Sequence, residues 1–131
     1  MSTKNKVLLI ESNRAEIMKI SKLFLSNKVA DKVVFFTAPA EAKDYIQSTS
    51  NSPQILPSLL MIDVSTYSHD SFEFLKYFGR LLRTHDLTCK VFLLKDSEDK
   101  GVIPSEVKTL IPIEKVLTKP LTFDKIASLV I

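Results

Sequence analysis

Short apolar runs recur along this chain of 131 residues and alternate with stretches of helical periodicity. The runs are KVLLI, KVVFF, LLMI, VFLL and KVLT, at residues 6–10, 32–36, 59–62, 91–94 and 115–118. A continuous aliphatic run such as LLMI is typical of a strand covered on both faces, because a strand with one wet face alternates between apolar and polar residues. The pattern therefore predicts βαβ units and a parallel sheet rather than hairpins.

Helical periodicity fills the stretches between these runs. Residues 14–25 carry apolar side chains at steps of three and four, and so do residues 72–83, for which Asp70 or Ser71 is the expected N-cap. A further helix is expected from Pro39 to about residue 47, and a last one over 123–130 with Thr122 as its N-cap. Only a short, weakly amphipathic helix is expected within residues 97–110. Polar loops are expected at residues 48–58 and 65–70.

The length and composition fit one globular domain over residues 1–131. A hydrophobic fraction of 45% with only two glycines is typical of a chain that buries a core. Strands that alternate with helices imply right-handed crossovers. We expect an α/β fold with a doubly wound, five-stranded parallel sheet of order 2-1-3-4-5, which is the flavodoxin-like winding. Ligands of such sheets bind outside the carboxyl ends of the strands, so the residues there are the candidates for function.

Charge and hydropathy limit the classes of partner. The formal net charge of +3 is small and the lysines are scattered along the chain, so direct binding to nucleic acid is not expected. No apolar stretch approaches the length of a membrane span, and the N-terminal residues MSTKNK do not resemble a signal peptide. Cys89 has no second cysteine with which to form a disulfide. We expect a cytoplasmic protein with no membrane partner.

Charged and polar residues follow the apolar runs. They are Glu11 and Ser12 after the first run, Asp63 after the third, Lys95 and Asp96 after the fourth, and Lys119 after the fifth. We expect these side chains to converge, because the carboxyl ends of parallel strands share one edge of a sheet. Neighbouring carboxylates can hold Mg²⁺ and a nearby lysine can pair with phosphate, which outlines a site for phosphoryl transfer. Charged residues also end strands simply because the chain reaches water there.

Three motifs resemble those of bacterial response regulator receiver domains, in the same order along the chain. KVLLIESN is similar to that family's first strand and acidic pair, LLMIDVSTYSHDSFEFLK to its third strand, phosphoacceptor and next helix, and VLTKPL to its fifth strand and Lys-Pro pair. The resemblance spans residues 6–130. It implies that Asp63 is the phosphoacceptor, that Lys119 contacts the phosphoryl group, and that Glu11 and Asp63 ligate Mg²⁺.

Several positions depart from that family's pattern. Ser12 stands where the family has a second acidic metal ligand, which predicts weak binding of Mg²⁺. Lys95 stands at the position of a hydroxyl residue that contacts the phosphoryl group, although a small register shift would place Ser97 there. The remaining departures are Val116 for a common aromatic residue, Thr66-Tyr67 for Met-Pro, and Ser71 for a frequent glycine.

Lys95 admits two interpretations. Together with Lys119 it can bring two ammonium groups close to Asp63 and neutralise the carboxylate that Mg²⁺ would otherwise serve, which favours one fixed state. Alternatively, its side chain points into solvent from a loop, as lysine side chains usually do.

The leading hypothesis for function is a receiver in a phosphorelay. Asp63 would accept a phosphoryl group from a histidine kinase or a phosphotransfer protein. A downstream protein would bind the surface formed by the helix expected within residues 97–110, the strand at 115–118 and the last helix. The alternative is a degenerate receiver that binds proteins without being phosphorylated.

Two further classes of function are not favoured. A flavin-binding protein of this fold would need small or hydroxyl residues in the loop after the first strand, and the loop ESNRAE has no glycine, so no bound organic cofactor is expected. The chain carries no nucleophile elbow, glycine-rich phosphate loop or dinucleotide fingerprint, so we do not expect an independent enzyme.

Overall fold

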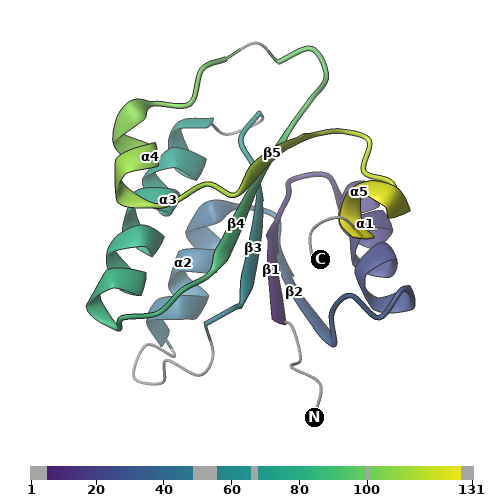
Figure 1. The fold of residues 1–131 in the computed structure, drawn as a ribbon, viewed down its shortest axis with the longest axis horizontal. Helices are drawn as coiled ribbons and strands as arrows, with labels where there is room; N and C mark the ends of the chain where they lie inside the picture. The colour runs from purple at the N-terminus through teal and green to yellow at the C-terminus, as the bar shows by residue number, and fades with distance from the viewer. Residues whose placement is uncertain (1–5, 49–55, 66–67, 100, 128–131) are drawn as a thin grey trace.

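The computed structural model of this chain describes residues 6–48, 56–65, 68–99 and 101–127 (Figure 1). Within them, strands and helices alternate from the first element to the last. The strands are β1 (Lys6–Ile10), β2 (Lys32–Phe36), β3 (Leu59–Asp63), β4 (Lys90–Lys95) and β5 (Lys115–Thr118). The helices are α1 (Arg14–Ser26), α2 (Pro39–Ser48), α3 (Ser68–Thr84), α4 (Ser105–Leu110) and α5 (Phe123–Ala127).

The strands form one parallel sheet in the order β2-β1-β3-β4-β5. β1 lies between β2 and β3, with Leu8 opposite Val34 on one side and Leu60 on the other. β3 pairs in turn with β4, where Ile62 is opposite Leu93, and β4 pairs with β5. The predicted fold class and strand order are confirmed. The order reverses between β1 and β3, and this reversal is the position at which ligands of doubly wound sheets bind.

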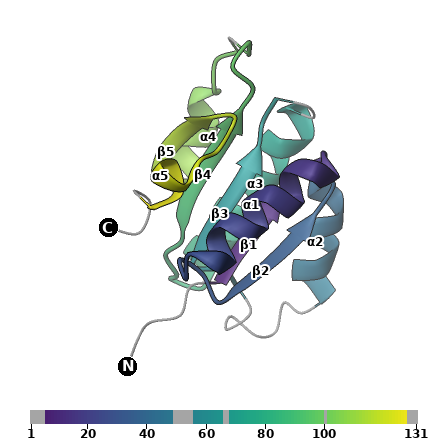
Figure 2. The same ribbon diagram turned by 90° about the vertical axis from the view of Figure 1, so that its right-hand side faces the viewer.

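Helices cover both faces of the sheet (Figure 1, Figure 2). α2, α3 and α4 pack on one face, where Phe78 of α3 shares a core with Leu60 of β3. α1 and α5 pack on the other, where Phe24 of α1 shares a core with Met61. Leu60 and Met61 belong to different cores because successive side chains of a strand point to opposite faces. In the described part of the chain, no helix is long and apolar enough to span a membrane.

The central position of β3 explains its sequence. All five of its residues are buried, which includes Asp63 at its carboxyl end. β2 and β5 form the two edges of the sheet and carry several exposed residues. The apolar run LLMI is therefore the signature of a strand with neighbours on both sides and helices on both faces. It delivers one carboxylate to the end of the most enclosed strand.

The helix after β3 begins earlier than the periodicity predicted. We expected residues 72–83 with Asp70 or Ser71 as N-cap, but α3 spans Ser68–Thr84 and places both residues in its first turn. The N-cap prediction was therefore wrong, and so was the extent of the polar loop at 65–70. The Ser71 hydroxyl is not available as an N-cap, because its buried Oγ donates a 2.8 Å hydrogen bond to the carbonyl oxygen of Asp63. This bond ties the first turn of α3 directly to the end of β3.

The other elements follow the predictions within a few residues. β3 and β4 are slightly longer than the apolar runs that marked them, and the short helix expected within residues 97–110 is α4. The amide of Lys125 donates to Thr122 Oγ1 at 3.4 Å, as the N-cap prediction requires. Residues 49–55, 66–67 and 128–130 lie outside the described part of the chain. The predictions made for Thr66 and Tyr67, for most of the 48–58 loop and for the end of the last helix fall there.

The contact between α3 and α4 depends on a glycine. A Cβ atom at Gly79 would lie 2.6 Å from the carbonyl oxygen of Leu110 and 3.1 Å from the Cβ of Ile111. The first distance is shorter than any normal contact and involves backbone, so the end of α4 would have to move. Gly79 is therefore present for close approach of α4 rather than for an unusual backbone angle.

We expect Gly79→Ala to lower the free energy of unfolding by about 1–3 kcal/mol because it overpacks this contact. Helix propensity alone predicts the opposite, a gain of roughly 1 kcal/mol for alanine over glycine. Urea unfolding followed by circular dichroism measures the difference. Arg80→Ala, at an exposed position of the same helix, is the matched control and should change stability by less than about 0.5 kcal/mol. A more stable Gly79→Ala variant would show that α4 does not pack here.

Candidate functional site

The strand order brings three predicted site residues to one edge of the sheet. Glu11 directly follows β1, Asp63 ends β3 and Lys119 directly follows β5. Backbone hydrogen bonds extend the sheet beyond the strands, from Glu11 N to Phe36 O at 3.1 Å and from Lys119 N to Lys95 O at 2.9 Å. The backbone around each of the three residues is therefore held by the sheet or its extension. Side chains from β1, β3 and β5 can meet only because these strands are parallel.

The ammonium group of Lys119 lies between two buried carboxylates. Its Nζ is 2.5 Å from Glu11 Oε1 and 3.3 Å from Asp63 Oδ2. The side chain of Glu11 is 1% exposed and that of Asp63 is 2% exposed, whereas Lys119 retains 14%. An ion pair in such an environment is strong in Coulombic terms and is offset by the loss of hydration of both partners. The structure confirms the predicted convergence of Glu11, Asp63 and Lys119.

Burial and pairing act on the pKa values in opposite directions. Burial raises the pKa of Glu11 above its ordinary value, and the hydrogen bonds from Lys119 and from the amide of Asn13 offset only part of that rise. Burial lowers the pKa of Lys119, but the hydrogen bond to Glu11 and the charge of Asp63 outweigh it, so the net shift is upward. Lys119 is therefore firmly cationic at neutral pH, while Glu11 is the group whose charge is least favourable.

Local hydrogen bonds fix the orientation of the two carboxylates. Glu11 Oε2 accepts from the amide of Asn13 at 3.0 Å, just before α1 begins, and Asn13 in turn caps that helix through Glu16 N. Asp63 Oδ1 accepts from the amide of Ser65 at 2.8 Å. Each carboxylate therefore has one oxygen toward its own loop and the other toward Lys119. Both groups are held before any ligand arrives.

A third carboxylate, Asp96, adds to this cluster. Its Oδ1 lies 3.5 Å from Lys119 Nζ, and its side chain is 57% exposed. Asp96 is among the side chains expected from the sequence to converge at this edge, and its contact with Lys119 confirms that expectation. The signal was its position after the fourth strand, because β4 lies between β3 and β5 in the sheet.

The structure gives Lys95 a role that neither interpretation of the sequence considered. Its ammonium donates a 2.8 Å hydrogen bond to the carbonyl oxygen of Gly101, in the loop between β4 and α4. Pairing with Asp63 and free solvation were the two expectations, and the lysine instead binds backbone of its own loop. Ser65, in the loop after β3, brings a hydroxyl to the site, and its Oγ contacts Asp96 N and Asp99.

An open cavity of about 670 Å³ lies over this cluster at the carboxyl edge of the sheet. The loops after β1, β3, β4 and β5 line it, with side chains that are mostly polar. Its lining consists of Glu11, Ser12, Asn13, Glu16, Ser65, Asp96, Ser97, Glu98, Asp99, Lys119 and Pro120. Asp63 is not in this lining. Ser12, where a second acidic ligand was missing from the sequence pattern, is in the wall.

The donor set favours at most a weak site for Mg²⁺. In the ranges that the structure describes, no group of three or more His, Cys, Asp or Glu side chains is placed to hold a metal ion. Glu11 and Asp63 are suitable oxygen donors, but each already pairs with Lys119. A cation at this position would compete with an ammonium group for the same two carboxylates.

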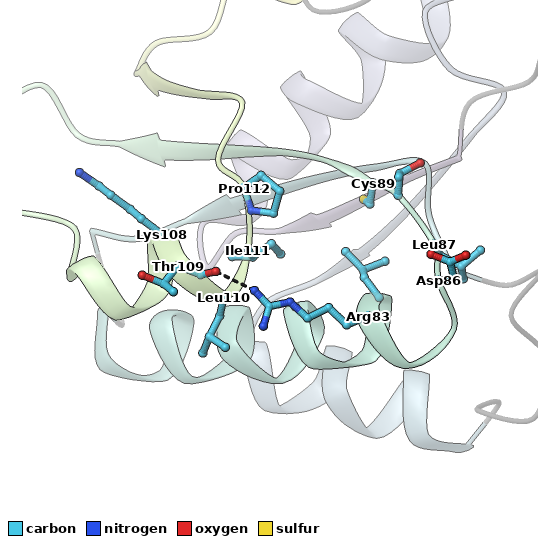
Figure 3. Close-up of a pocket in the computed structure, with 12 residues that line it drawn as sticks. Arg83, Asp86, Leu87, Cys89, Lys108, Thr109, Leu110, Ile111 and Pro112 are labelled. Carbon is cyan, nitrogen blue, oxygen red and sulfur yellow. Dashed lines mark hydrogen bonds between the residues drawn. The ribbon is translucent and has the colours of Figure 1, made fainter.

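A second cavity, of about 420 Å³, lies near the start of β4, away from the carboxyl ends of the strands (Figure 3). The residues between α3 and β4 and those at the end of α4 line it, and Arg83 Nη2 donates a 2.7 Å hydrogen bond to Thr109 O beside it. Burial raises the pKa of the Cys89 thiol in its wall to about 12, so this thiol stays protonated at neutral pH. The cavity has no counterpart of the Glu11, Asp63 and Lys119 cluster among its lining residues.

Solved structures of the same architecture match the chain over nearly its whole length. A two-component response regulator from Legionella pneumophila superposes with a TM-score of 0.69 at 22% identity, covering 96% of this chain and 95% of that one. The fold is that of response regulator receiver domains. A receiver domain protein from Clostridium thermocellum gives a TM-score of 0.69 at 16% identity, covering 96% and 90% of the two chains.

A third similar structure contains a partner protein. It is a co-crystal structure of a histidine phosphotransfer signalling protein and the receiver domain of its downstream response regulator from Saccharomyces cerevisiae. The matched chain has a TM-score of 0.71 at 14% identity, with 99% of this chain and 88% of that chain covered. No protein-family model matches the chain, and no curated protein does. The receiver fold therefore rests on structural similarity.

We expect Lys119→Met to lower the free energy of unfolding by about 2–3 kcal/mol at pH 7, because it leaves two neighbouring carboxylates buried without their cation. The loss should shrink as the pH falls from 7 toward 5. Lys119 lowers the pKa of Glu11, so its removal leaves that pKa higher than in the wild type, under the influence of burial and of Asp63. Protonation of Glu11 in the variant then relieves the repulsion as the pH falls. Urea unfolding at each pH measures both effects.

The matched control is Lys115→Met, which removes an exposed ammonium group from the start of the same strand. It should change stability by less than about 0.5 kcal/mol at every pH. A loss for Lys119→Met that did not depend on pH would mean that Lys119 acts through packing rather than through charge.

We also expect Cys89 to react with a thiol reagent such as dithionitrobenzoate about a thousandfold more slowly in the native protein than in unfolded protein at pH 8. The reason is that the thiolate is the nucleophile, and raising the pKa from 9.0 to about 12 removes most of it. The rate in guanidinium is the control. Equal rates in both conditions would show that the thiol is not buried in solution.

Proposed function

We propose that this chain is a receiver of a phosphorelay, in which Asp63 accepts a phosphoryl group from a histidine kinase or a histidine phosphotransfer protein. The observation that carries the proposal is the meeting of Glu11, Asp63 and Lys119 at the switch point of the sheet, with Lys119 Nζ 3.3 Å from Asp63 Oδ2. The receiver fold supports it. So does the similar receiver domain that was solved together with a histidine phosphotransfer protein.

The transfer itself would be a single displacement at phosphorus. A carboxylate oxygen of Asp63 forms a bond to phosphorus while the bond from phosphorus to the donor's imidazole nitrogen breaks, and the imidazole leaves with that electron pair. Lys119 neutralises charge on the oxygens of the transferred group, which is the main task of a protein in phosphoryl transfer. Glu11 holds Lys119 in place through their short ion pair. Mg²⁺ would add positive charge at Glu11 and Asp63, but with low affinity, because Ser12 supplies no carboxylate.

The output surface in this proposal is formed by α4, β5 and α5, and its partner is a protein. Val116 of β5 is 39% exposed and Phe123 at the start of α5 is 48% exposed, so large apolar side chains are available there for a partner. The net charge of +3 gives no reason to propose nucleic acid instead. We place this function in the cytoplasm and propose no enzymatic activity beyond acceptance of the phosphoryl group.

A second candidate function is a degenerate receiver that binds its partners without phosphorylation. The observation that favours it is the burial of Asp63, whose side chain is 2% exposed and does not line the cavity. Lys95 supports the same candidate. Its ammonium group is bonded to the carbonyl oxygen of Gly101, and this position supplies no hydroxyl to the site. Both candidates share the fold and the proposed output surface, and they differ in whether Asp63 reacts.

Incubation with acetyl phosphate and Mg²⁺, followed by intact-mass spectrometry, separates the two. We expect the wild-type protein to gain one phosphoryl group slowly and incompletely, because each missing contact to the transferred group is commonly worth about a hundredfold in rate. Asp63→Asn should gain none, whereas Asp44→Asn, at an exposed carboxylate of α2, should behave as wild type. Ser12→Asp should be faster, and Ser12→Asp combined with Lys95→Thr faster still.

Two outcomes would change the assignment. Rapid and complete modification of the wild type would show that the departures at Ser12 and Lys95 do not impair the site. If the variant that combines Ser12→Asp with Lys95→Thr also stays unmodified, Asp63 is not a phosphoacceptor and the degenerate receiver is the better description.

A further inference from the structure

The loop between β4 and α4 is tied to the loop after β3 by one hydroxyl group. Ser65 Oγ accepts a hydrogen bond from the amide of Asp96 at 2.8 Å and donates one to Asp99 Oδ2 at 3.0 Å. The amide of the same serine donates to Asp63 Oδ1 at 2.8 Å. Ser65 therefore joins the carboxylate at the end of β3 to two positions of the β4–α4 loop.

The bonds continue through the loop and return to β4. Asp99 Oδ1 accepts from the amide of Gly101 at 2.7 Å, and the carbonyl oxygen of Gly101 accepts from Lys95 Nζ at 2.8 Å. The hydrogen bond from Gly101, followed by that from Ser65, lowers the pKa of Asp99, so both bonds are made to an ionised acceptor. The hydrogen bonds thus run from Lys95 through Gly101 and Asp99 to Ser65. Ser65 then returns to the loop at Asp96, the residue next to Lys95.

The helix that follows this loop is held by separate contacts on α3. Glu106 of α4 pairs with Lys76 at 2.9 Å, and Val107 is buried in the core shared with Phe78. Arg83 Nη2 donates to the carbonyl oxygen of Thr109. The body of α4 therefore rests on α3, while the approach to its first turn depends on the β4–α4 loop. Ser65 is the point at which that loop contacts the site.

We propose that Ser65 is a latch residue, whose hydroxyl holds the β4–α4 loop in one position in the unmodified protein. The latch fixes the loop that leads into α4 of the proposed output surface. It goes beyond the proposed function, because it requires only the contacts among Ser65, Asp96 and Asp99. An ordinary loop serine would exchange its hydroxyl bonds with water, whereas this one has both a donor and an acceptor partner across the two loops.

The test is amide hydrogen exchange by nuclear magnetic resonance on the unmodified protein. Ser65→Ala removes the acceptor of the Asp96 amide, and we expect that amide to exchange about tenfold faster, with a smaller increase at Gly101. Val107 in the first turns of α4 should change less, because Lys76 still holds Glu106. Ser65→Thr keeps the hydroxyl and should exchange as wild type. Ser97→Ala, at an exposed hydroxyl of the same loop, is the matched control.

The amide of Leu9 in β1 reports whether a variant remains folded. If Ser65→Ala leaves the Asp96 amide as slow as Ser97→Ala does, other contacts hold the loop and the proposal is wrong. If instead Ser65→Ala accelerates Leu9 as well, Asp99→Asn decides, because it weakens the acceptor of Ser65 and Gly101 at a surface position. Asp99→Asn should then accelerate the amide of Asp96, because that amide donates to the Ser65 hydroxyl that Asp99 orients, and an unchanged Asp96 amide would overturn the latch. No result depends on whether acetyl phosphate modifies Asp63.

Discussion

The ion pair between Lys119 and the two buried carboxylates is the constraint on which the site depends. Glu11 follows β1, Asp63 ends β3 and Lys119 follows β5, so the three charges meet when the sheet is assembled in its parallel order. Neither carboxylate would be favourable at that depth without the ammonium between them. The ammonium group that offsets these two buried charges is also the group to which the proposed function assigns the phosphoryl oxygens, so stability and the proposed function depend on a single side chain.

The parts of this arrangement that the sequence could predict are those set by hydrophobic periodicity. A continuous run such as LLMI can be accommodated only in the middle of a covered sheet, and the alternation of runs with helices leaves few ways to order the strands. Once the order is known, the residues that end each strand must share an edge. Asp63 and Lys119 could be paired in this way although 56 residues separate them.

The parts that the sequence could not predict depend on individual hydrogen bonds between loops. Nothing in the periodicity of α3 indicates that Ser71 bonds to the carbonyl oxygen of Asp63, and this bond occupies the hydroxyl that was expected to cap the helix. The orientation of the Lys95 side chain also depends on a single hydrogen bond, which it donates to the carbonyl oxygen of Gly101. Ser65 looks like any polar loop residue until the fold brings Asp99 beside it.

The charge distribution around the open cavity has a consequence for encounter with a donor. Carboxylates outnumber ammonium groups along its lining, with Glu11, Glu16, Asp96, Glu98 and Asp99 set against Lys119. The field at the mouth is therefore negative, even though the chain as a whole carries +3. Free phosphate esters approach against this field, and in about 0.1 M salt the repulsion is largely screened beyond a distance of about 10 Å. A protein surface with a basic rim is attracted to the same mouth, so the field favours a basic protein over a free phosphate ester.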